Sequence, residues 1–316
     1  MSMMSGLRAS GLPKRWSKVQ CFKNTLIYLA LRTIIAIMQK LPWFSLRLLA
    51  RLLAPTAYLL ATKERKVALS NLAMALPELS STQRKSITRK MFYHLALSVM
   101  EIIQIERFFT ADQALQLDPE HRKLFEQALA EGQGVVAVTG HIGNWELLAQ
   151  FLVKQGIPMV TIARPTYDPR LTQWLDAFRS QYGLEVIWRG ENSVSREMIR
   201  TFRANKILAL LMDQDTRVQS VFSPFFGRMA HTPSAAAALA LRFNAPIILG
   251  WSHRESNGHQ FYFERIEPPE TEDQEAAKTE LVNLLNQRLE AAIRRKPEQW
   301  VWLHQRWKTQ PSTNGA

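Results

Sequence analysis

Residues 135–148 read VVAVTGHIGNWELL, and this stretch sets the interpretation of the rest of the chain. Its first five residues are apolar or β-branched, which predicts a short buried strand that ends at Gly140. Helical spacing resumes after Asn144, so His141 is expected in the turn and Glu146 in the first turns of a helix. A strand followed directly by a helix is the unit of α/β folds, in which reacting groups collect at the carboxyl ends of strands.

The same alternation continues to the end of the chain. Short apolar runs predict strands at 135–139, 158–163, 185–188, 207–212 and 246–251, with a further strand at 259–266 that could lie at an edge. The runs between them predict helices at 145–155, 169–182, 194–204, 233–243 and 275–295. We therefore expect an α/β fold, with a mostly parallel central sheet flanked by helices.

The first part of the chain predicts helices only, at 63–76, from a cap at Ser80 or Ser81 to about Phe109, and at 119–131. No internal repeat or low-complexity linker divides the chain. We predict three parts: a basic N-terminus with a membrane anchor over 1–62, a helical segment that packs on the domain after it over 63–132, and an α/β core over 133–316.

Charge is concentrated near the N-terminus. The net charge is +13, and residues 1–63 contain ten Lys or Arg and no Asp or Glu. The segment from Thr25 is also strongly apolar, but Arg32 interrupts it before it reaches the ~18–20 apolar residues of a clear membrane span. The pattern favours a membrane-associated segment that spans once or lies in the interface, with anionic lipids as partners. A cleaved signal peptide fits poorly, and an amphipathic helix packed on the core is the remaining alternative.

Composition narrows the class of protein. Apolar residues make up 47% and charged residues 21%, which excludes a disordered chain. The single cysteine, Cys21, excludes an intrachain disulfide and indicates a reducing compartment. A balance this basic implies an acidic partner: nucleic acid, anionic headgroups or an acidic protein.

Polar residues follow three of the predicted strands. Glu146 could accept a hydrogen bond from one imidazole nitrogen of His141 and leave the other as a general base; the alternative is a helix cap and a first-turn carboxylate. Arg164 follows the second strand, where a cation suits a phosphate or an oxyanion, or forms a salt bridge. Asp213 and Asp215 follow the fourth strand as a like-charge or metal-binding pair, or as a turn residue and a cap. No other ligand spacing is firm, so no metal is expected.

Two further stretches are rich in aromatic residues. Residues 221–228 read VFSPFFGR and are expected to form an apolar loop, in which Phe225 and Phe226 would close the core or form the wall of an apolar ligand site. Residues 300–308 read WVWLHQRWK, which suits a membrane interface or single-stranded nucleic acid, although such tails most often pack on the core.

Together these motifs resemble the late acyltransferases of lipid A biosynthesis, the lauroyl and myristoyl acyltransferases of the wider H-x-x-x-x-D/E superfamily. The resemblance rests on an ordered set spread over roughly residues 30–308: TGHIGNWE at 139–146, ARP at 163–165, DQD at 213–215, FSPFFG at 222–227 and PEQWVWLHQRWK at 297–308. Position 300 departs from the pattern, because tryptophan stands where the family more often has tyrosine.

The resemblance implies a glycerolipid-acyltransferase-like fold, in which the α/β core over 133–316 is the acyltransferase domain. It also implies an enzyme on the cytoplasmic face of the cell inner membrane, held by a single N-terminal anchor. It would move a fatty acyl chain from acyl carrier protein to a hydroxyl of a lipid A precursor, with acyl carrier protein as co-substrate, no cofactor and no nucleic acid partner. His141 would be the general base and Glu146 its orienting group. Arg164 would steady an oxyanion or bind a phosphate, and Asp213 would organise the same pocket. Asp215 and Asn144 are assigned to substrate binding, and Phe225 and Phe226 to the acyl-chain wall.

Three alternatives stay open. The acceptor could be another glycolipid or a lysophospholipid. The same pair could act with water, as a hydrolase or thioesterase. The protein could also be a basic peripheral membrane-binding or nucleic-acid-binding protein without catalysis, whose binding would weaken steeply with salt.

Overall fold

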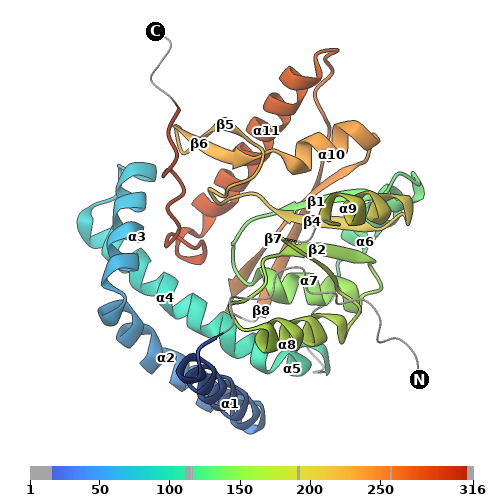
Figure 1. Cartoon of the computed structure of the whole chain (residues 1–316). Helices are drawn as coiled ribbons and strands as arrows, with labels where there is room; N and C mark the ends of the chain where they lie inside the picture. The colour runs from blue at the N-terminus through green and yellow to red at the C-terminus, as the bar shows by residue number, and fades with distance from the viewer. Residues whose placement is uncertain (1–15, 111–114, 116, 191–192, 257, 312–316) are drawn as a thin grey trace, which may run out of the picture.

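The structure is a computed structural model, and it describes residues 16–110, 115, 117–190, 193–256 and 258–311 (Figure 1). Helices precede the first strand: α1 (Lys18–Lys40), α2 (Trp43–Leu60), α3 (Thr62–Ala75), α4 (Ser81–Ile103), α5 (Ile105–Thr110) and α6 (Pro119–Ala130). Strands and helices then alternate through β1 (Val135–Thr139), α7 (Trp145–Lys154), β2 (Met159–Ala163), α8 (Pro169–Ser180), β3 (Glu185–Trp188), α9 (Val194–Arg203) and β4 (Ile207–Leu211). The remaining elements are β5 (Ser220–Phe225), β6 (Arg228–Pro233), α10 (Ala235–Phe243), β7 (Ile247–Glu255), β8 (Gly258–Ile266), α11 (Gln274–Arg295) and a 3-10 turn, η1 (Pro297–Gln299).

The main sheet has six strands in the order β3-β2-β4-β1-β7-β8. All neighbours are parallel except β7 and β8, so the mostly parallel sheet is confirmed. β8 lies at one edge and β3 at the other. β1 and β4 lie at the centre, where both faces of a strand are covered, and their apolar, β-branched sequences match that environment. β1 pairs with β4 rather than with β2, so the site that follows β1 is next to the site that follows β4.

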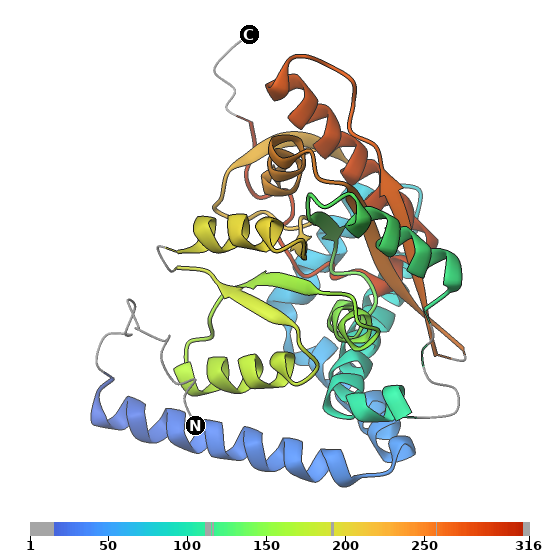
Figure 2. The same cartoon turned by 90° about the vertical axis from the view of Figure 1, so that its right-hand side faces the viewer.

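Helices cover both faces of this sheet (Figures 1 and 2). Alternate residues of β1 point to opposite faces: Val136 and Val138 pack into the cluster that includes α9, α10 and α11, whereas Val135 packs with α6 and α7. In Figure 2, α8 lies on the same side as α7, and α1 runs along the outer side of α8. Arg170 of α8 joins these two helices by donating a 3.0 Å hydrogen bond to the Thr25 hydroxyl.

The N-terminal helices follow the capping rules. Ser80 is the N-cap of α4 and forms a capping box with Gln83, which confirms the expected start of that helix. The expected helix to Phe109 is broken at Gln104, whose side-chain amide donates to the carbonyls of Met38 and Leu41 and so ties the break to the end of α1.

α1 is the helix, among the described residues, that is long and apolar enough to cross a membrane by itself, with a mean hydropathy of 1.4 over its best window. Only 11% of that window is buried. α2 and α3 reach the same criterion only as a pair that is bent by 87°. An apolar helix that leaves most of its surface uncovered in the folded chain is a candidate for membrane anchoring.

The expected apolar loop at 221–228 is instead the β5–β6 hairpin. Phe226 and Gly227 both have positive φ, 52° and 69°, which makes the two-residue connection a type I′ turn. The turn was hard to foresee because the residue at its first position is a phenylalanine, which seldom adopts positive φ.

Candidate active site

The register of the two central strands creates the site. Thr139 at the end of β1 is level with Leu211 at the end of β4. The chains continue in step for two more residues, so His141 and Asp213 lie side by side at the carboxyl edge of the sheet. His141 Nδ1 lies 2.8 Å from Asp213 Oδ1, and the backbone N–H of His141 donates to Asp213 Oδ2 at 2.6 Å.

Asp213 has no exposed surface, and its hydrogen-bond partners among the described residues are all donors. Besides the two groups of His141, the indole Nε1 of Trp300 donates to Oδ2 at 2.8 Å. Burial by itself would raise the pKa of Asp213, but the charge and hydrogen bonds of His141, with the Trp300 hydrogen bond, hold it well below its usual range. Asp213 is therefore an ionised carboxylate that fixes one ring nitrogen of His141.

The other side of the His141 ring is partly open. The His141 side chain is 19% exposed, and its ring edge packs on Trp145 with 4.8 Å between centroids. The Gln214 amide nitrogen lies 3.1 Å from Nδ1 and 2.9 Å from Nε2 of His141, and it also contacts Nε2 of His304. Burial and the neighbouring His141 lower the pKa of His304 to about 4. His304 is thus neutral at pH 7, and within the described part of the chain the only charged side chain in contact with the ring of His141 is that of Asp213.

The turn between β1 and α7 is held by close backbone packing. Gly143 has φ +62°, and a Cβ there would lie 2.1 Å from the carbonyl oxygen of Ser252. A Cβ at Gly140 would lie 2.9 Å from Asp213 Oδ2. These two glycines therefore provide the space that the close approach of Ser252 and Asp213 requires.

The backbone amides of this turn already have acceptors. The N–H groups of residues 141, 142, 143 and 144 donate to Asp213 Oδ2, to the carbonyl of Gly140, to the carbonyl of Gln299 and to the Ser252 hydroxyl. These four amides are therefore not free to bind an oxyanion.

Glu146 lies in the first turn of α7, but its partner is not His141. Its two carboxylate oxygens accept from Nε and Nη2 of Arg179 on α8, both at 2.8 Å. The expected hydrogen bond between Glu146 and His141 is replaced by the bond between Asp213 and His141. The physical reason is strand order: β4 lies next to β1, whereas Glu146 on the helix is directed toward α8.

Asn144 was expected to bind substrate, and the structure places it in the interior. It is 2% exposed and caps α7 by accepting from the N–H of Leu147. Its amide donates to Glu101 Oε2 at 2.8 Å and to the Ser98 carbonyl at 3.3 Å. With all of these groups in use, Asn144 links the His141 turn to α4 instead of facing a ligand.

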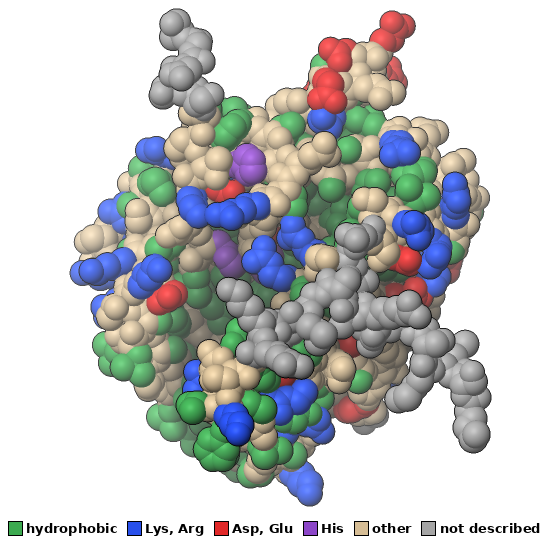
Figure 3. Space-filling view, in the orientation of Figure 1, with side chains coloured by type: hydrophobic (Ala, Val, Ile, Leu, Met, Phe, Trp, Pro, Cys, Tyr) green, Lys and Arg blue, Asp and Glu red, His purple; other side chains and the backbone are tan. Residues whose placement is uncertain are grey.

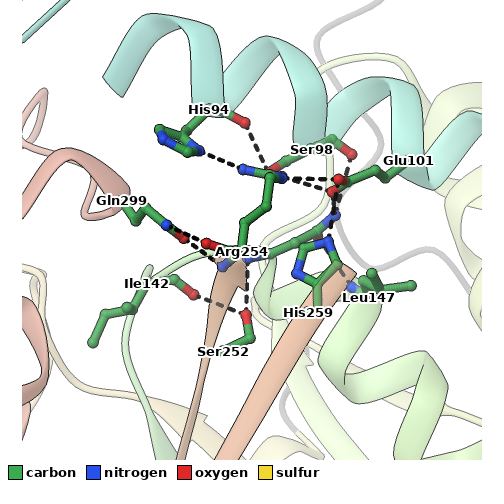
Figure 4. A network of polar contacts seen from close by, with 10 residues as sticks. His94, Ser98, Glu101, Ile142, Leu147, Ser252, Arg254, His259 and Gln299 are labelled. Carbon is green, nitrogen blue, oxygen red and sulfur yellow. Dashed lines mark hydrogen bonds and ion pairs between the residues drawn. The ribbon is translucent and has the colours of Figure 1, made fainter. Parts of the chain in front are cut away.

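Glu101 belongs to a closed polar cluster between α4, β7 and β8, defined by His94, Ser98, Glu101, Arg254 and His259 (Figure 4). Arg254 donates to both carboxylate oxygens of Glu101, at 2.9 and 2.6 Å, and to the Ser98 hydroxyl at 2.9 Å. It also contacts His94 Nδ1 at 2.7 Å, and His259 Nε2 lies 3.1 Å from Glu101. Burial and the Arg254 charge lower the pKa of His94 to about 3. The cluster is thus a guanidinium–carboxylate pair with neutral His94 as an acceptor.

The closed cluster also holds the C-terminal segment. The Gln299 side chain accepts from the N–H of Arg254 at 2.7 Å and donates to its carbonyl at 2.9 Å. The next residue is Trp300, which binds Asp213, and Ile142 forms a β-bridge with it. The two polar clusters therefore meet at residues 299 and 300.

Arg164 follows β2 at the same sheet edge and is exposed. Arg189 follows β3 and Arg217 follows β4, so three guanidinium groups come after neighbouring strands. Within the described parts of the chain, none of the three forms an ion pair with a carboxylate. Figure 3 shows Lys and Arg side chains gathered beside the exposed histidines on this face. The edge is thus positively charged and open to an anion.

Asp215 and the two phenylalanines lie apart from His141. Asp215 binds His231 Nδ1 at 3.2 Å and accepts from the Thr309 N–H at 2.8 Å, so the two aspartates do not form a pair. Phe225 is fully buried and Phe226 is 5% exposed, and both pack against tryptophans of the C-terminal segment. They close the core and do not line an open acyl site.

Several residues of this region carried no recognisable signal in the sequence. Gln214 stood between the two aspartates, and His304 and Trp300 were assigned only to an aromatic tail. Arg179 and Arg254 are single charges in ordinary helix and strand patterns, and only the tertiary structure gives them partners. No group of three or more His, Cys, Asp or Glu side chains is placed to hold a metal within the described residues.

Comparisons with known proteins identify the family. The family described as bacterial lipid A biosynthesis acyltransferase matches residues 13–309. The chain is 24% identical over 257 residues to a lipid A biosynthesis palmitoleoyltransferase of Escherichia coli, covering 79% of this chain and 80% of that protein. It is 27% identical over 255 residues to a lipid A biosynthesis acyltransferase of Haemophilus influenzae, with 79% and 77% covered. A phosphatidylinositol mannoside acyltransferase of Mycolicibacterium smegmatis is 26% identical over 184 residues, which span 57% of this chain and 59% of that protein. The chain therefore belongs to the bacterial lipid A biosynthesis acyltransferase family.

Proposed function

We propose that this protein transfers a fatty acyl chain from the thioester of acyl carrier protein to a hydroxyl group of a lipid A precursor, at the cytoplasmic face of the inner membrane. Family membership supports acyl transfer to a glycolipid, and relatives named for lipid A match about four fifths of the chain. The observation that carries the proposal is the pairing of half-buried His141 with buried Asp213 at the positively charged edge of the sheet.

His141 acts as the general base. Its Nδ1–H donates to Asp213, which leaves the lone pair on Nε2 to accept the proton of the acceptor hydroxyl. The hydroxyl oxygen then attacks the thioester carbonyl carbon, the tetrahedral intermediate collapses, and the carbon–sulfur bond breaks. His141 returns the proton to the departing thiolate, so the products are an ester and the free thiol of the carrier.

Asp213 is the positioning residue in this scheme. A carboxylate that stays ionised beside the ring stabilises the imidazolium that forms when His141 takes the proton. Trp300 and the N–H of His141 hold the carboxylate from its other side, which prevents it from rotating away. The Gln214 amide lies where the acceptor hydroxyl must approach Nε2, so substrate binding displaces it.

Arg164 supplies the positive charge for the oxyanion, because the amides of the turn are already occupied. Arg189 and Arg217 extend the positive edge and suit two acidic partners, a phosphorylated glycolipid and an acyl carrier protein. Glu146 acts through Arg179. The two hydrogen bonds from Arg179 to the Glu146 carboxylate hold α7 against α8 and so fix the turn that carries His141.

The test is mass spectrometry of the lipid products after incubation with acyl carrier protein thioesters. Wild-type protein is expected to add the mass of one acyl chain to a lipid A precursor, and His141→Ala is expected to lose roughly 10²–10⁴-fold in rate. His121→Ala is the matched control, because that histidine lies on α6 and packs on Phe263.

Two parallel reactions separate the alternatives. A phosphatidylinositol mannoside acceptor in place of the lipid A precursor distinguishes the two acceptor classes named among the relatives. Release of free fatty acid at the same rate with and without a lipid acceptor would instead indicate a thioesterase. Full activity of His141→Ala would refute the mechanism.

A further inference from the structure

A groove of about 440 Å³ lies between α2 and α4, away from His141. The apolar part of its lining comes from α2, with buried Ala54 and exposed Pro55 and Leu59. Two exposed guanidinium groups also line it, Arg51 from α2 and Arg89 from α4. A surface groove with apolar and cationic lining matches a ligand that is apolar along its length and negative at one end.

The cations gather around one aromatic ring. The guanidinium carbons of Arg65 and Arg89 lie 5.0 and 5.3 Å from the ring centroid of Tyr58, which lines the same groove. Among the described residues, neither Arg51 nor Arg89 forms an ion pair, and Arg65 donates only to the Tyr58 carbonyl. Like charges brought together without a carboxylate repel one another, and an anion placed between them would remove that repulsion.

The groove opens beside the apolar surface of α2. Leu48, Leu52 and Leu59 are 53%, 60% and 65% exposed, and their spacing of four and seven residues places them on one side of the helix. Arg51 stands at the border of this stripe. An arginine that borders exposed leucines extends its stem along apolar surface and its guanidinium toward lipid phosphates. Figure 3 shows hydrophobic side chains with Lys and Arg among them over α1 and α2.

The backbone adds one more acceptor. Pro55 lies inside α2 and has no N–H to donate, so the carbonyl of Arg51 lacks its usual helical partner. A carbonyl next to the guanidinium groups suits a headgroup that carries a hydroxyl as well as a phosphate.

We propose that this groove binds one anionic glycerophospholipid of the membrane. Its phosphate lies between Arg51 and Arg89, and an acyl chain packs along Pro55 and Leu59. The opposite face of α4 supplies His94 and Ser98 to the closed polar cluster, so the groove is separated from His141 by that helix. The lipid is a bound component that sets the depth and orientation of the N-terminal helices in the membrane, and the inference does not depend on the acceptor of the proposed reaction.

The experiment measures thermal stabilisation of the full-length protein by dihexanoyl phosphatidylglycerol, a short-chain lipid used below its micelle concentration. The wild-type protein is expected to show a saturable rise in melting temperature. Arg51→Gln/Arg89→Gln is expected to weaken the apparent affinity at least tenfold. Lys66→Gln/Lys90→Gln is the matched control: it removes the same charge from exposed positions of α3 and α4 that do not line the groove, and it should bind within about twofold of wild type.

Three comparisons decide between sources of the signal. Dihexanoyl phosphatidylcholine and glycerol phosphate are each expected to bind at least tenfold more weakly; equal binding of either would overturn the need for net charge or for the acyl chain. Stronger binding of a phosphorylated glucosamine disaccharide would assign the groove to the acceptor lipid and overturn the proposal. Equal loss in the control variant would show a general charge effect and would also overturn it.

A second measurement uses only the wild-type protein, in case the double variant unfolds. A photoreactive short-chain phosphatidylglycerol is expected to cross-link to residues 51–59 and 89–93, mapped by peptide mass spectrometry. Cross-links confined to other segments would refute the assignment.

Discussion

Two polar clusters lie on either side of the turn after β1, and they contain the same kinds of groups. One has a carboxylate, Asp213, with His141 and His304; the other has a carboxylate, Glu101, with His94 and His259. The difference is the position of the cation. In the second cluster Arg254 neutralises the carboxylate at a side-chain exposure of 10%. In the first, no arginine among the described residues forms an ion pair with Asp213, and His141 is 19% exposed. A closed cluster stabilises the fold, and a cluster with one open nitrogen can exchange a proton.

The largest effect should follow from removing the charge of the open cluster. Asp213→Asn keeps the shape but leaves an amide beside His141, which destabilises the imidazolium and disturbs the tautomer. We expect kcat to fall roughly 10²–10⁴-fold with a smaller change in KM. Steady-state kinetics with acyl carrier protein thioesters measures this. A variant with wild-type kcat would show that the two clusters do not differ in function.

The closed cluster should respond in stability instead. Arg254→Met leaves Glu101 buried without its guanidinium, and breaking such a pair costs about 3–5 kcal/mol. Urea unfolding of the purified protein measures the loss, and activity per folded molecule should stay within about tenfold of wild type. The double variant Glu101→Gln/Arg254→Met should recover part of the stability, because it removes the orphaned charge. A 10³-fold fall in activity at unchanged stability would contradict this division.

A smaller effect is expected for the ion pair between Glu146 and Arg179, which we expect to influence activity only by positioning the turn that carries His141. If Glu146 acts only through Arg179, then Glu146→Gln, Arg179→Gln and the double variant should lower kcat to a similar extent, by roughly tenfold. A double-mutant cycle on kcat then gives a coupling energy close to the single effects, about 1–1.5 kcal/mol. Additive losses would mean that Glu146 has a separate role at His141.

At neutral pH the smallest effect is expected at His94, because its influence on stability appears only as the pH falls. The pKa of His94 is lowered to about 3, so between that value and the usual value of about 6.5 the unfolded chain binds a proton that the native protein does not. The free energy of unfolding is therefore highest above pH 6.5, where His94 is neutral in both states, and it decreases as the pH falls toward 3. His94→Gln should make the free energy of unfolding less dependent on pH in this window, measured by urea unfolding at several pH values. An unchanged slope would show that His94 does not differ from a solvent-exposed histidine.

The sequence predicted the elements well and their partners poorly. Strands such as 135–139 and 185–188 are short apolar runs between turn signals, and local pattern is enough to locate them. The identity of the carboxylate at His141 depends on which strand lies next to β1, and no local pattern encodes that order. Glu146 was favoured because it is near in the chain, and Asp213 was placed only in the same pocket. Arg254 and Glu101 are separated by 153 residues, so no spacing rule could connect them.

The contact between Trp300 and Asp213 has a consequence for the order in which the protein is made. The two residues are 87 positions apart, and the ribosome delivers Trp300 long after His141 and Asp213 have left it. A nascent chain with β1 and β4 already paired would hold the base and its carboxylate without the indole donor and without His304. The apolar α1 is translated before all of these groups, so a growing chain can meet the lipid surface while its reaction centre is still incomplete. Biosynthesis thus makes the candidate membrane anchor first and completes the candidate active site last.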